Sequence, residues 1–122
     1  MPHCIIEHTD NVLDKPSWKN IFCELHKILV DTGQWIESDI KSRVLEHKNF
    51  YIGDGGSNQA FVTLNIQILD GRSDNIKKEI SQKALNLLRD NFPKSLKDLD
   101  FSITVQVSDI HPCYCRLVNY EN

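Results

Sequence analysis

The 122-residue sequence contains no apolar run that approaches the roughly 18 residues needed to cross a membrane. Its first residues also lack the basic stretch and the long apolar region of a secretory signal. Its 4 cysteines are unevenly scattered, which is typical of reduced thiols and not of a disulfide framework. We therefore expect a cytoplasmic protein with no membrane partner.

The sequence also has no excess of positive charge. The chain has 14 Lys and Arg against 17 Asp and Glu, which gives a net charge of -3 and a pI near 5.9. Because a protein that binds a phosphate polymer usually needs a basic face, this balance argues against nucleic acid as a partner. A local basic pocket stays compatible with the sequence, since net charge does not describe a single cleft.

Motifs for several common chemistries are missing. The glycine-rich stretch 53–56 lacks the Lys-Ser/Thr pair that follows a phosphate-binding loop, so we interpret it as a turn. The segment 111–115 contains His and Cys but has no matching second pair of ligands, so we expect no metal site.

The apolar residues form two consecutive strand-helix-strand units. In the strands they recur at every second position, and in the helices at three- and four-residue steps. Ser17 and Ser73 stand where the two helices would start, and Gly33 where the first would stop. The predicted order is strand 2–8, helix 17–32, strand 40–46, strand 60–68, helix 73–92 and strand 100–108.

Two such units predict an α+β fold in a single domain, residues 1–122. A crossover long enough to hold a helix is typical of parallel strands with a right-handed connection. We therefore expect a four-stranded mixed sheet with two helices on one face. The other face would have no helix of its own chain, which predicts self-association through the sheet.

Pro2 is the first candidate for chemistry. A residue as small as proline after the initiator methionine normally permits removal of Met1, and the chain then begins with a secondary amine. An α-amino group usually has a pKa of about 8, and burial or a neighbouring positive charge lowers it toward neutral pH, where a general base works best. Taken alone, the feature also fits a proline that simply begins an edge strand.

Basic residues form the second candidate group. Strand alternation places Lys41 and Arg43 on one face of the second predicted strand, and Arg72 lies in a turn at the start of the second helix. The planar guanidinium of arginine matches a carboxylate in two-point contact. Each residue, taken separately, also fits a solvated charge that protects a strand edge.

Together these residues resemble the 5-carboxymethyl-2-hydroxymuconate Δ-isomerase family of the tautomerase superfamily. The matching motifs are collinear, at near-family spacing, over essentially the whole chain. Any one of them is weak, but six in order are specific. They are PHCIIE at 2–7 with DN at 10–11, TG at 32–33, IKSRV at 40–44, AFV at 60–62, GRS at 71–73 and IHP at 110–112.

The resemblance implies a homotrimer of β-α-β/β-α-β subunits, with no cofactor and with active sites near subunit interfaces. It also implies that Pro2 transfers the proton and that Arg72 is one clamp for a substrate carboxylate. The implied reaction converts the dienol 5-carboxymethyl-2-hydroxymuconate to its unsaturated keto isomer. That reaction belongs to bacterial homoprotocatechuate (4-hydroxyphenylacetate) breakdown, a route of aromatic compound catabolism.

The sequence departs from the family pattern at Lys41. The family reads Ile-Arg-Ser-Arg-Val where this chain has Lys41 in place of the first arginine, which keeps the charge and loses the two-point fork. Arg43 matches the second basic position. Which of Lys41 and Arg43 contacts the substrate stays open at this level, as does the subunit that supplies each basic residue.

Two other interpretations also stay open. The first is a non-catalytic oligomeric domain that binds a small acid as a sensor or carrier. The second is a superfamily enzyme that acts on another unsaturated acid, by dehalogenation or hydration, and the departure at Lys41 keeps it in view.

Overall fold

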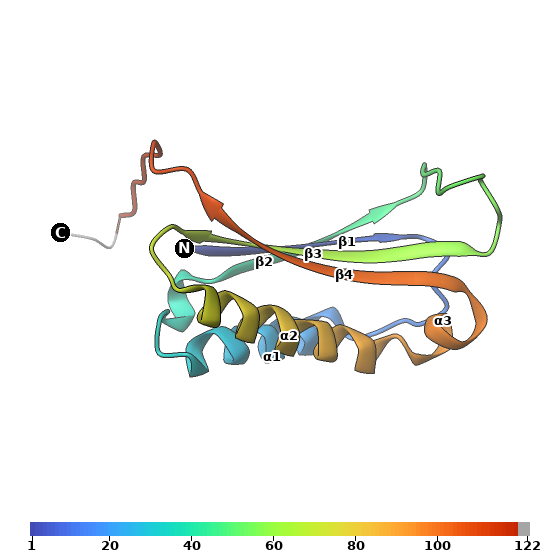
Figure 1. Cartoon of the computed structure of the whole chain (residues 1–122), viewed down its shortest axis with the longest axis horizontal. Coiled ribbons are helices and arrows are strands. Elements are labelled where there is room, and N and C mark those ends of the chain that lie inside the picture. Colours follow the sequence, from blue (N-terminus) through green and yellow to red (C-terminus); the bar gives the residue numbers. More distant parts are fainter. Residues whose placement is uncertain (120–122) are drawn as a thin grey trace.

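The computed structural model describes residues 1–119, and it shows one sheet with its helices gathered on one side (Figure 1). This confirms the predicted α+β architecture. Within the described range, none of the helices has the length and apolar character to span a bilayer. The elements follow in the order β1 (Pro2–Thr9), α1 (Trp18–Asp31), the 3₁₀ helix η1 (Glu37–Asp39), β2 (Lys41–His47), β3 (Gln59–Leu69), α2 (Asp74–Asn91), α3 (Pro93–Asp98) and β4 (Asp100–Ile110).

The four strands lie in the order β2-β1-β3-β4. β1 pairs with β2 in parallel and β3 pairs with β4 in parallel, whereas the central pair, β1 and β3, is antiparallel. In this register Pro2 lies opposite Ile68, and His3 lies opposite Lys41. The starts of β1 and β2 and the ends of β3 and β4 therefore meet at one end of the sheet.

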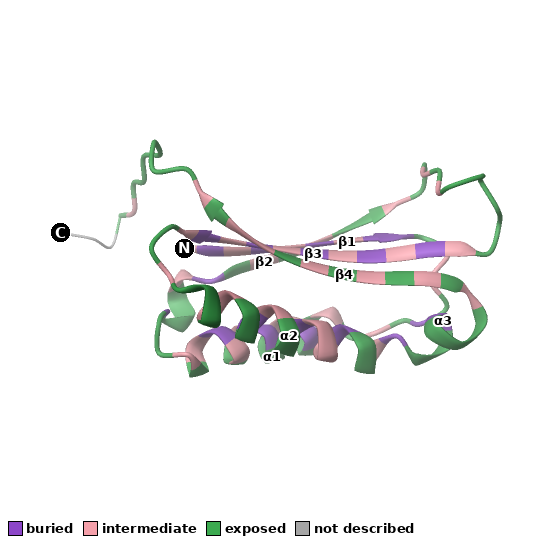
Figure 2. Cartoon of the chain, viewed as in Figure 1, coloured by how far each residue is buried: buried purple, intermediate pink, exposed green. Residues whose placement is uncertain are grey.

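The core lies between the sheet and the two long helices (Figure 2). Every second residue of β3 from Ala60 to Ile68 is buried, as period-two alternation predicts for a strand with one face on the core. Cys4, which packs in this layer, is fully buried, and burial raises the pKa of its thiol to about 11, so it stays protonated at neutral pH. The helices contribute one buried stripe each: Ile21, Leu25 and Leu29 from α1, and Ile80, Ala84 and Leu88 from α2.

Side-chain caps start both long helices where the sequence predicts them. The Ser17 hydroxyl accepts from the Asn20 N–H at 3.3 Å, and the Ser73 hydroxyl accepts from the Ile76 N–H at 3.3 Å. The prediction misses α3, because it reads Pro93 only as the end of the preceding helix. A proline at the first position of a helix needs no hydrogen-bond partner for its nitrogen, so Pro93 also begins a new one.

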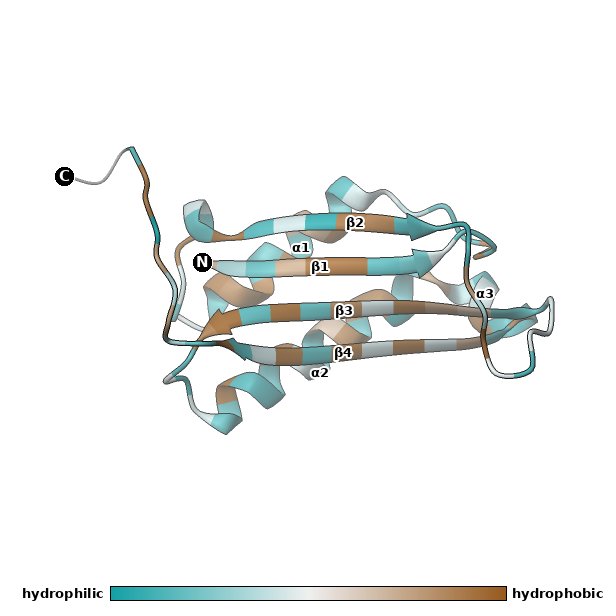
Figure 3. Cartoon of the chain, turned by 90° about the horizontal axis from the view of Figure 1, so that it is seen from above, coloured by the Kyte–Doolittle hydropathy of each residue, from teal (hydrophilic) through white to brown (hydrophobic). Residues whose placement is uncertain are grey.

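The opposite face of the sheet carries no helix of the described chain, and Figure 3 shows that face with α1 and α2 behind it. Its residues are mixed in character. Thr63, Asn65 and Gln67 of β3 alternate with the buried apolar positions, and Leu45 of β2 is 50% exposed. This is the uncovered surface on which the prediction of self-association rests.

A buried carboxylate joins the two halves of the chain at the end of the sheet where β1 ends and β4 begins. Asp14, 8% exposed, follows β1 and accepts from the Ser95 N–H at 2.8 Å, the Ser95 hydroxyl at 2.6 Å and the Lys94 N–H at 3.0 Å. These N–H groups belong to the first turn of α3, which has no side-chain cap of its own. Asp14 therefore caps a helix from about 80 residues away in the sequence.

Replacing Asp14 with Ala should lower the free energy of unfolding by about 2 kcal/mol, because it leaves buried donors without a charged acceptor. Burial alone would raise the pKa of Asp14, but the hydrogen bonds from Ser95 and Lys94 outweigh it and hold the pKa below its ordinary value. The stabilisation is therefore present above the unfolded pKa of about 3.9 and is lost as pH falls through the lower folded value.

Urea unfolding of Asp14→Ala and Asp98→Ala at neutral pH checks this. Asp98 is the exposed last residue of α3, where a negative charge gains nothing from the helix, so its removal should cost little. Equal stability of the two variants would contradict the assigned role.

Candidate active site

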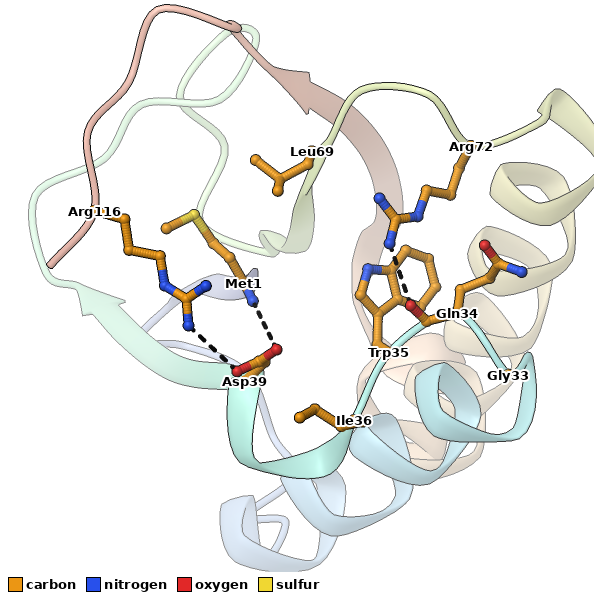
Figure 4. Close-up of a pocket in the computed structure, with 9 residues that line it drawn as sticks. All are labelled: Met1, Gly33, Gln34, Trp35, Ile36, Asp39, Leu69, Arg72 and Arg116. Carbon is orange, nitrogen blue, oxygen red and sulfur yellow. Dashed lines mark hydrogen bonds and ion pairs between the residues drawn. The ribbon is translucent and has the colours of Figure 1, made fainter. Parts of the chain in front are cut away.

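A pocket of about 300 Å³ opens at the end of the sheet where the four strand ends meet. Four separate segments line it: the N-terminus, the connection from α1 to β2, the connection from β3 to α2, and the tail after β4. In Figure 4, Met1, Asp39 and Arg116 lie on one side, and Gln34, Trp35 and Arg72 on the other. The lining residues are Met1, Gly33, Gln34, Trp35, Ile36, Asp39, Leu69, Arg72 and Arg116.

The amino group of the chain lies in this pocket. The Met1 nitrogen stands 3.9 Å from Asp39 Oδ2, which makes an ion pair. Pro2 follows directly, buried at the start of β1 and opposite Ile68 of β3. The candidate base predicted from the sequence is therefore held by the central pair of the sheet, next to the pocket.

The surroundings of the Met1 amino group change its pKa. Burial lowers the pKa of the N-terminal amine below its usual value, and the Asp39 carboxylate acts in the opposite direction. The positive charges of Lys41, Arg116 and Arg72 lower the pKa further. The net effect favours the neutral, basic form of the amine at a lower pH than in an exposed chain end.

Asp39 and Arg116 also line the pocket, although no motif in the sequence marks either of them. Asp39 ends η1, just before β2, and its Oδ1 lies 3.5 Å from Arg116 Nη2. Arg116 belongs to the tail after β4, which runs across the end of the sheet past the start of β1 (Figure 3). No local pattern in the sequence marks Arg116. It reaches the pocket because β4 ends at the end of the sheet where β1 begins, so the residues after β4 start near the N-terminus.

Arg72 holds the other side of the pocket. One guanidinium nitrogen donates to the Gln34 carbonyl at 3.2 Å, and the guanidinium carbon lies 5.2 Å from the centre of the Trp35 ring. The preceding Gly71 has a φ of 105°, which only glycine adopts easily and which turns the chain from β3 into α2. A guanidinium has five N–H donors, so Arg72 retains donors for a carboxylate.

Lys41 and Arg43 lie on the same face of β2 but at different distances from the pocket. Both point to the uncovered face of β2, as alternation predicts, and neither is among the described residues that line the pocket. Lys41 stays at its edge: its Nζ donates to the Asp39 carbonyl at 3.5 Å. Arg43 lies two residues further along and donates to His3 Nδ1 at 3.1 Å.

This arrangement is suited to acid-base chemistry on an anion. It combines an amine of lowered pKa, cations on two sides, and apolar walls from Trp35, Ile36 and Leu69. Cations near a base hold a carboxylate substrate and stabilise negative charge that develops on oxygen. Among the described residues, no group of His, Cys, Asp and Glu side chains is arranged to hold a metal ion.

Two β-α-β units joined by a central antiparallel pair, with the N-terminus where the strand ends meet, are the arrangement that the resemblance to the tautomerase superfamily implies. The family model for 5-carboxymethyl-2-hydroxymuconate isomerase matches residues 2–119. The chain belongs to this family, which confirms the resemblance seen in its motifs.

Individual relatives agree with this. The 5-carboxymethyl-2-hydroxymuconate Delta-isomerase of Escherichia coli is 24% identical over 112 residues, which cover 92% of this chain and 89% of that protein. The crystal structure of a 5-carboxymethyl-2-hydroxymuconate isomerase from Deinococcus radiodurans R1 has a TM-score of 0.88 at 25% identity, covering 97% of this chain and 89% of that one. A fused 4-OT wild-type symmetric trimer shares the fold, with a TM-score of 0.66 at 15% identity and coverage of 96% and 92%.

Trp35 should report on carboxylate binding at Arg72, since the two side chains are in contact. The chain has 2 tryptophans, so in Trp18→Phe all tryptophan emission comes from Trp35. In this background, fumarate should cause a saturable change in emission. Adding Arg72→Ala should weaken the apparent affinity at least about tenfold, the effect of losing hydrogen bonds to a charged group.

Arg89→Ala in the same background is the control, because Arg89 is an exposed residue in the last turn of α2. Equal affinities of the Arg72 and Arg89 variants would remove Arg72 from the binding site.

Proposed function

We propose that the protein is a cofactor-independent isomerase that ketonises 5-carboxymethyl-2-hydroxymuconate or a similar 2-hydroxydienoate, with Pro2 as its acid-base group. The observation that carries the proposal is the position of the N-terminus, in a pocket between the cations Arg72 and Arg116 and beside Lys41. Membership of the isomerase family supports the reaction class. The homoprotocatechuate route in the cytoplasm is the source of substrate that fits this reaction.

The proposed reaction is a proton transfer in two steps. With Met1 removed, the Pro2 nitrogen accepts the hydroxyl proton of the bound dienol, which leaves a dienolate and a prolinium ion. The prolinium ion then donates a proton to a carbon of the dienolate, which forms a C–H bond, moves the double bonds and restores the amine. One base can serve both steps because a rigid site holds the intermediate beside it.

The basic residues take different parts in this proposal. Arg72 holds a substrate carboxylate with the N–H donors that the Gln34 carbonyl does not use. Lys41, whose charge lowers the pKa of the Met1 amine, would balance the negative charge that develops on the dienolate oxygen. Arg43 acts indirectly in this proposal, through the hydrogen bond that it donates to His3.

Removal of Met1 has two effects in this site. While Met1 is present it converts the Pro2 nitrogen into an amide, which is not a base, and it also lines the pocket. Its removal therefore creates the base and enlarges the space beside it. The active form in this proposal is the chain that begins at Pro2.

Pro2→Ala tests the mechanism. The variant begins with a primary amine in place of the rigid secondary amine, and kcat/KM for ketonisation of a 2-hydroxymuconate-type dienol should fall by about 100-fold or more. The ultraviolet change on ketonisation measures the rate, with intact mass confirming the absence of Met1 in every sample.

Pro16→Ala is the matched control, because Pro16 lies before α1 and outside the described pocket lining. Equal rates for wild type and Pro2→Ala would defeat the isomerase mechanism and leave a binding role for the pocket.

We also propose that the protein is a homotrimer that associates through the uncovered face of the sheet. The solved relative named as a fused symmetric trimer has the same fold. The exposed apolar side chain of Leu45 on this face supports the proposal, since such surface is normally covered.

Analytical ultracentrifugation should give a mass three times the 14.1 kDa of the chain. Leu45→Lys should weaken the trimer, because it places a charge in the proposed interface. Leu96→Lys should not, since Leu96 is similarly exposed (43% against 50%) but lies on α3, on the helical side. A wild-type monomer would contradict the trimer, and an unchanged Leu45→Lys assembly would contradict the use of this face.

A further inference from the structure

We propose that Asp39 is a positioning residue whose carboxylate binds the protonated N-terminal amine in the pocket and also pairs with Arg116 of the tail. This inference rests on the proposed role of Pro2 as the acid-base group. It gives the amine a negatively charged partner, in addition to the basic residues that surround it.

The Asp39 carboxylate lies close to both the N-terminal amine and the Arg116 guanidinium. Its Oδ2 lies 3.9 Å from the N-terminal nitrogen, and its Oδ1 lies 3.5 Å from Arg116 Nη2. Figure 4 shows the carboxylate between the two. The side chain is 25% exposed, so water screens these interactions only in part.

The backbone around Asp39 is fixed. Its own N–H donates to the Ile36 carbonyl at 3.1 Å, which closes η1, and its carbonyl accepts from Lys41 Nζ at 3.5 Å. Two residues later the chain enters β2, where Lys41 pairs with His3 in the parallel register. The carboxylate is thereby held alongside the start of β1.

Removal of Met1 transfers the amino group to Pro2, at the start of β1. The amino group moves back by one residue, about 3.5 Å along an extended chain, and the Met1 side chain leaves the pocket. Asp39 ends η1 just before β2, and β2 runs beside β1 with Lys41 opposite His3, so the Asp39 backbone lies next to the start of β1.

The charges around the amine come from every neighbouring element. Lys41 of β2, Arg72 after β3 and Arg116 after β4 disfavour its protonated form, whereas Asp39 favours it, and His3 of β1 is the nearest titratable group on its own strand. A prolinium ion must exist between the two proton transfers. In this proposal Asp39, whose charge raises the pKa of the Met1 amine, stabilises that ion, and the cations stabilise the dienolate.

The test is a pH titration of the Pro2 nitrogen, followed by ¹⁵N NMR of ¹⁵N-proline-labelled protein that lacks Met1. Asp39→Asn removes the charge and keeps the shape of the side chain, so the midpoint should move to lower pH. Arg116→Ala removes a positive charge, so the midpoint should move to higher pH. Asp39→Glu should return it toward the wild-type value.

Glu37→Gln is the matched control, since it removes the same charge from the same 3₁₀ turn. Glu37 is exposed and lines a different cavity, beside His26, so the midpoint should not change. In an enzyme that isomerises the dienol, the acid limb of the pH profile of kcat/KM should follow the NMR midpoint, because the base must be unprotonated to act.

An Asp39→Asn midpoint equal to that of wild type, or a Glu37→Gln shift of equal size, would overturn the inference. The NMR readout needs no turnover. A protein that fails to isomerise dienols but shows the Asp39 shift therefore loses the proposed function and keeps the Asp39–amine interaction.

Discussion

The antiparallel pairing of β1 with β3 is the constraint from which the site follows. Each β-α-β unit alone has parallel strands, and a parallel pair starts at one end of a sheet and finishes at the other. Joining the units head to tail through the central antiparallel pair brings two strand starts and two strand ends to the same place. Four stretches of chain that are distant in the sequence thereby contribute side chains to one pocket.

Charge is arranged around the amine with both signs. Burial and three basic side chains lower the pKa of the Met1 amine, and one carboxylate opposes them. An amine surrounded by cations alone would be a poor proton acceptor, whereas one paired only with carboxylates would stay protonated at neutral pH. Proton transfer in both directions requires a balance between these limits, which the chain obtains from residues on η1, β2, the turn before α2 and the tail.

Local sequence patterns were sufficient to predict most of the fold but fewer of the residues in the candidate site. Alternation and helical periodicity locate the strands and long helices, and Ser17 and Ser73 mark the helix starts, because these signals depend on nearby residues only. Pro2, Lys41 and Arg72 carry motifs, so the family resemblance could bring them together. Asp39 and Arg116 could not be predicted, since neither has a distinctive local pattern and their contact depends on the order of strands in the sheet. The cap that Asp14 provides for α3 could not be predicted either, because it joins residues about 80 positions apart in the sequence.

The strand order also gives the subunit an internal pseudo-twofold axis, perpendicular to the sheet, that exchanges β1 with β3 and β2 with β4. Rotation about this axis carries the pocket end of the sheet onto the opposite end, so the scaffold presents the same convergence of strand termini twice. At the opposite end the counterpart of the first strand begins at Gln59, inside the chain, where the backbone nitrogen is an amide. A duplicated framework can therefore house amine chemistry at only one of its two ends.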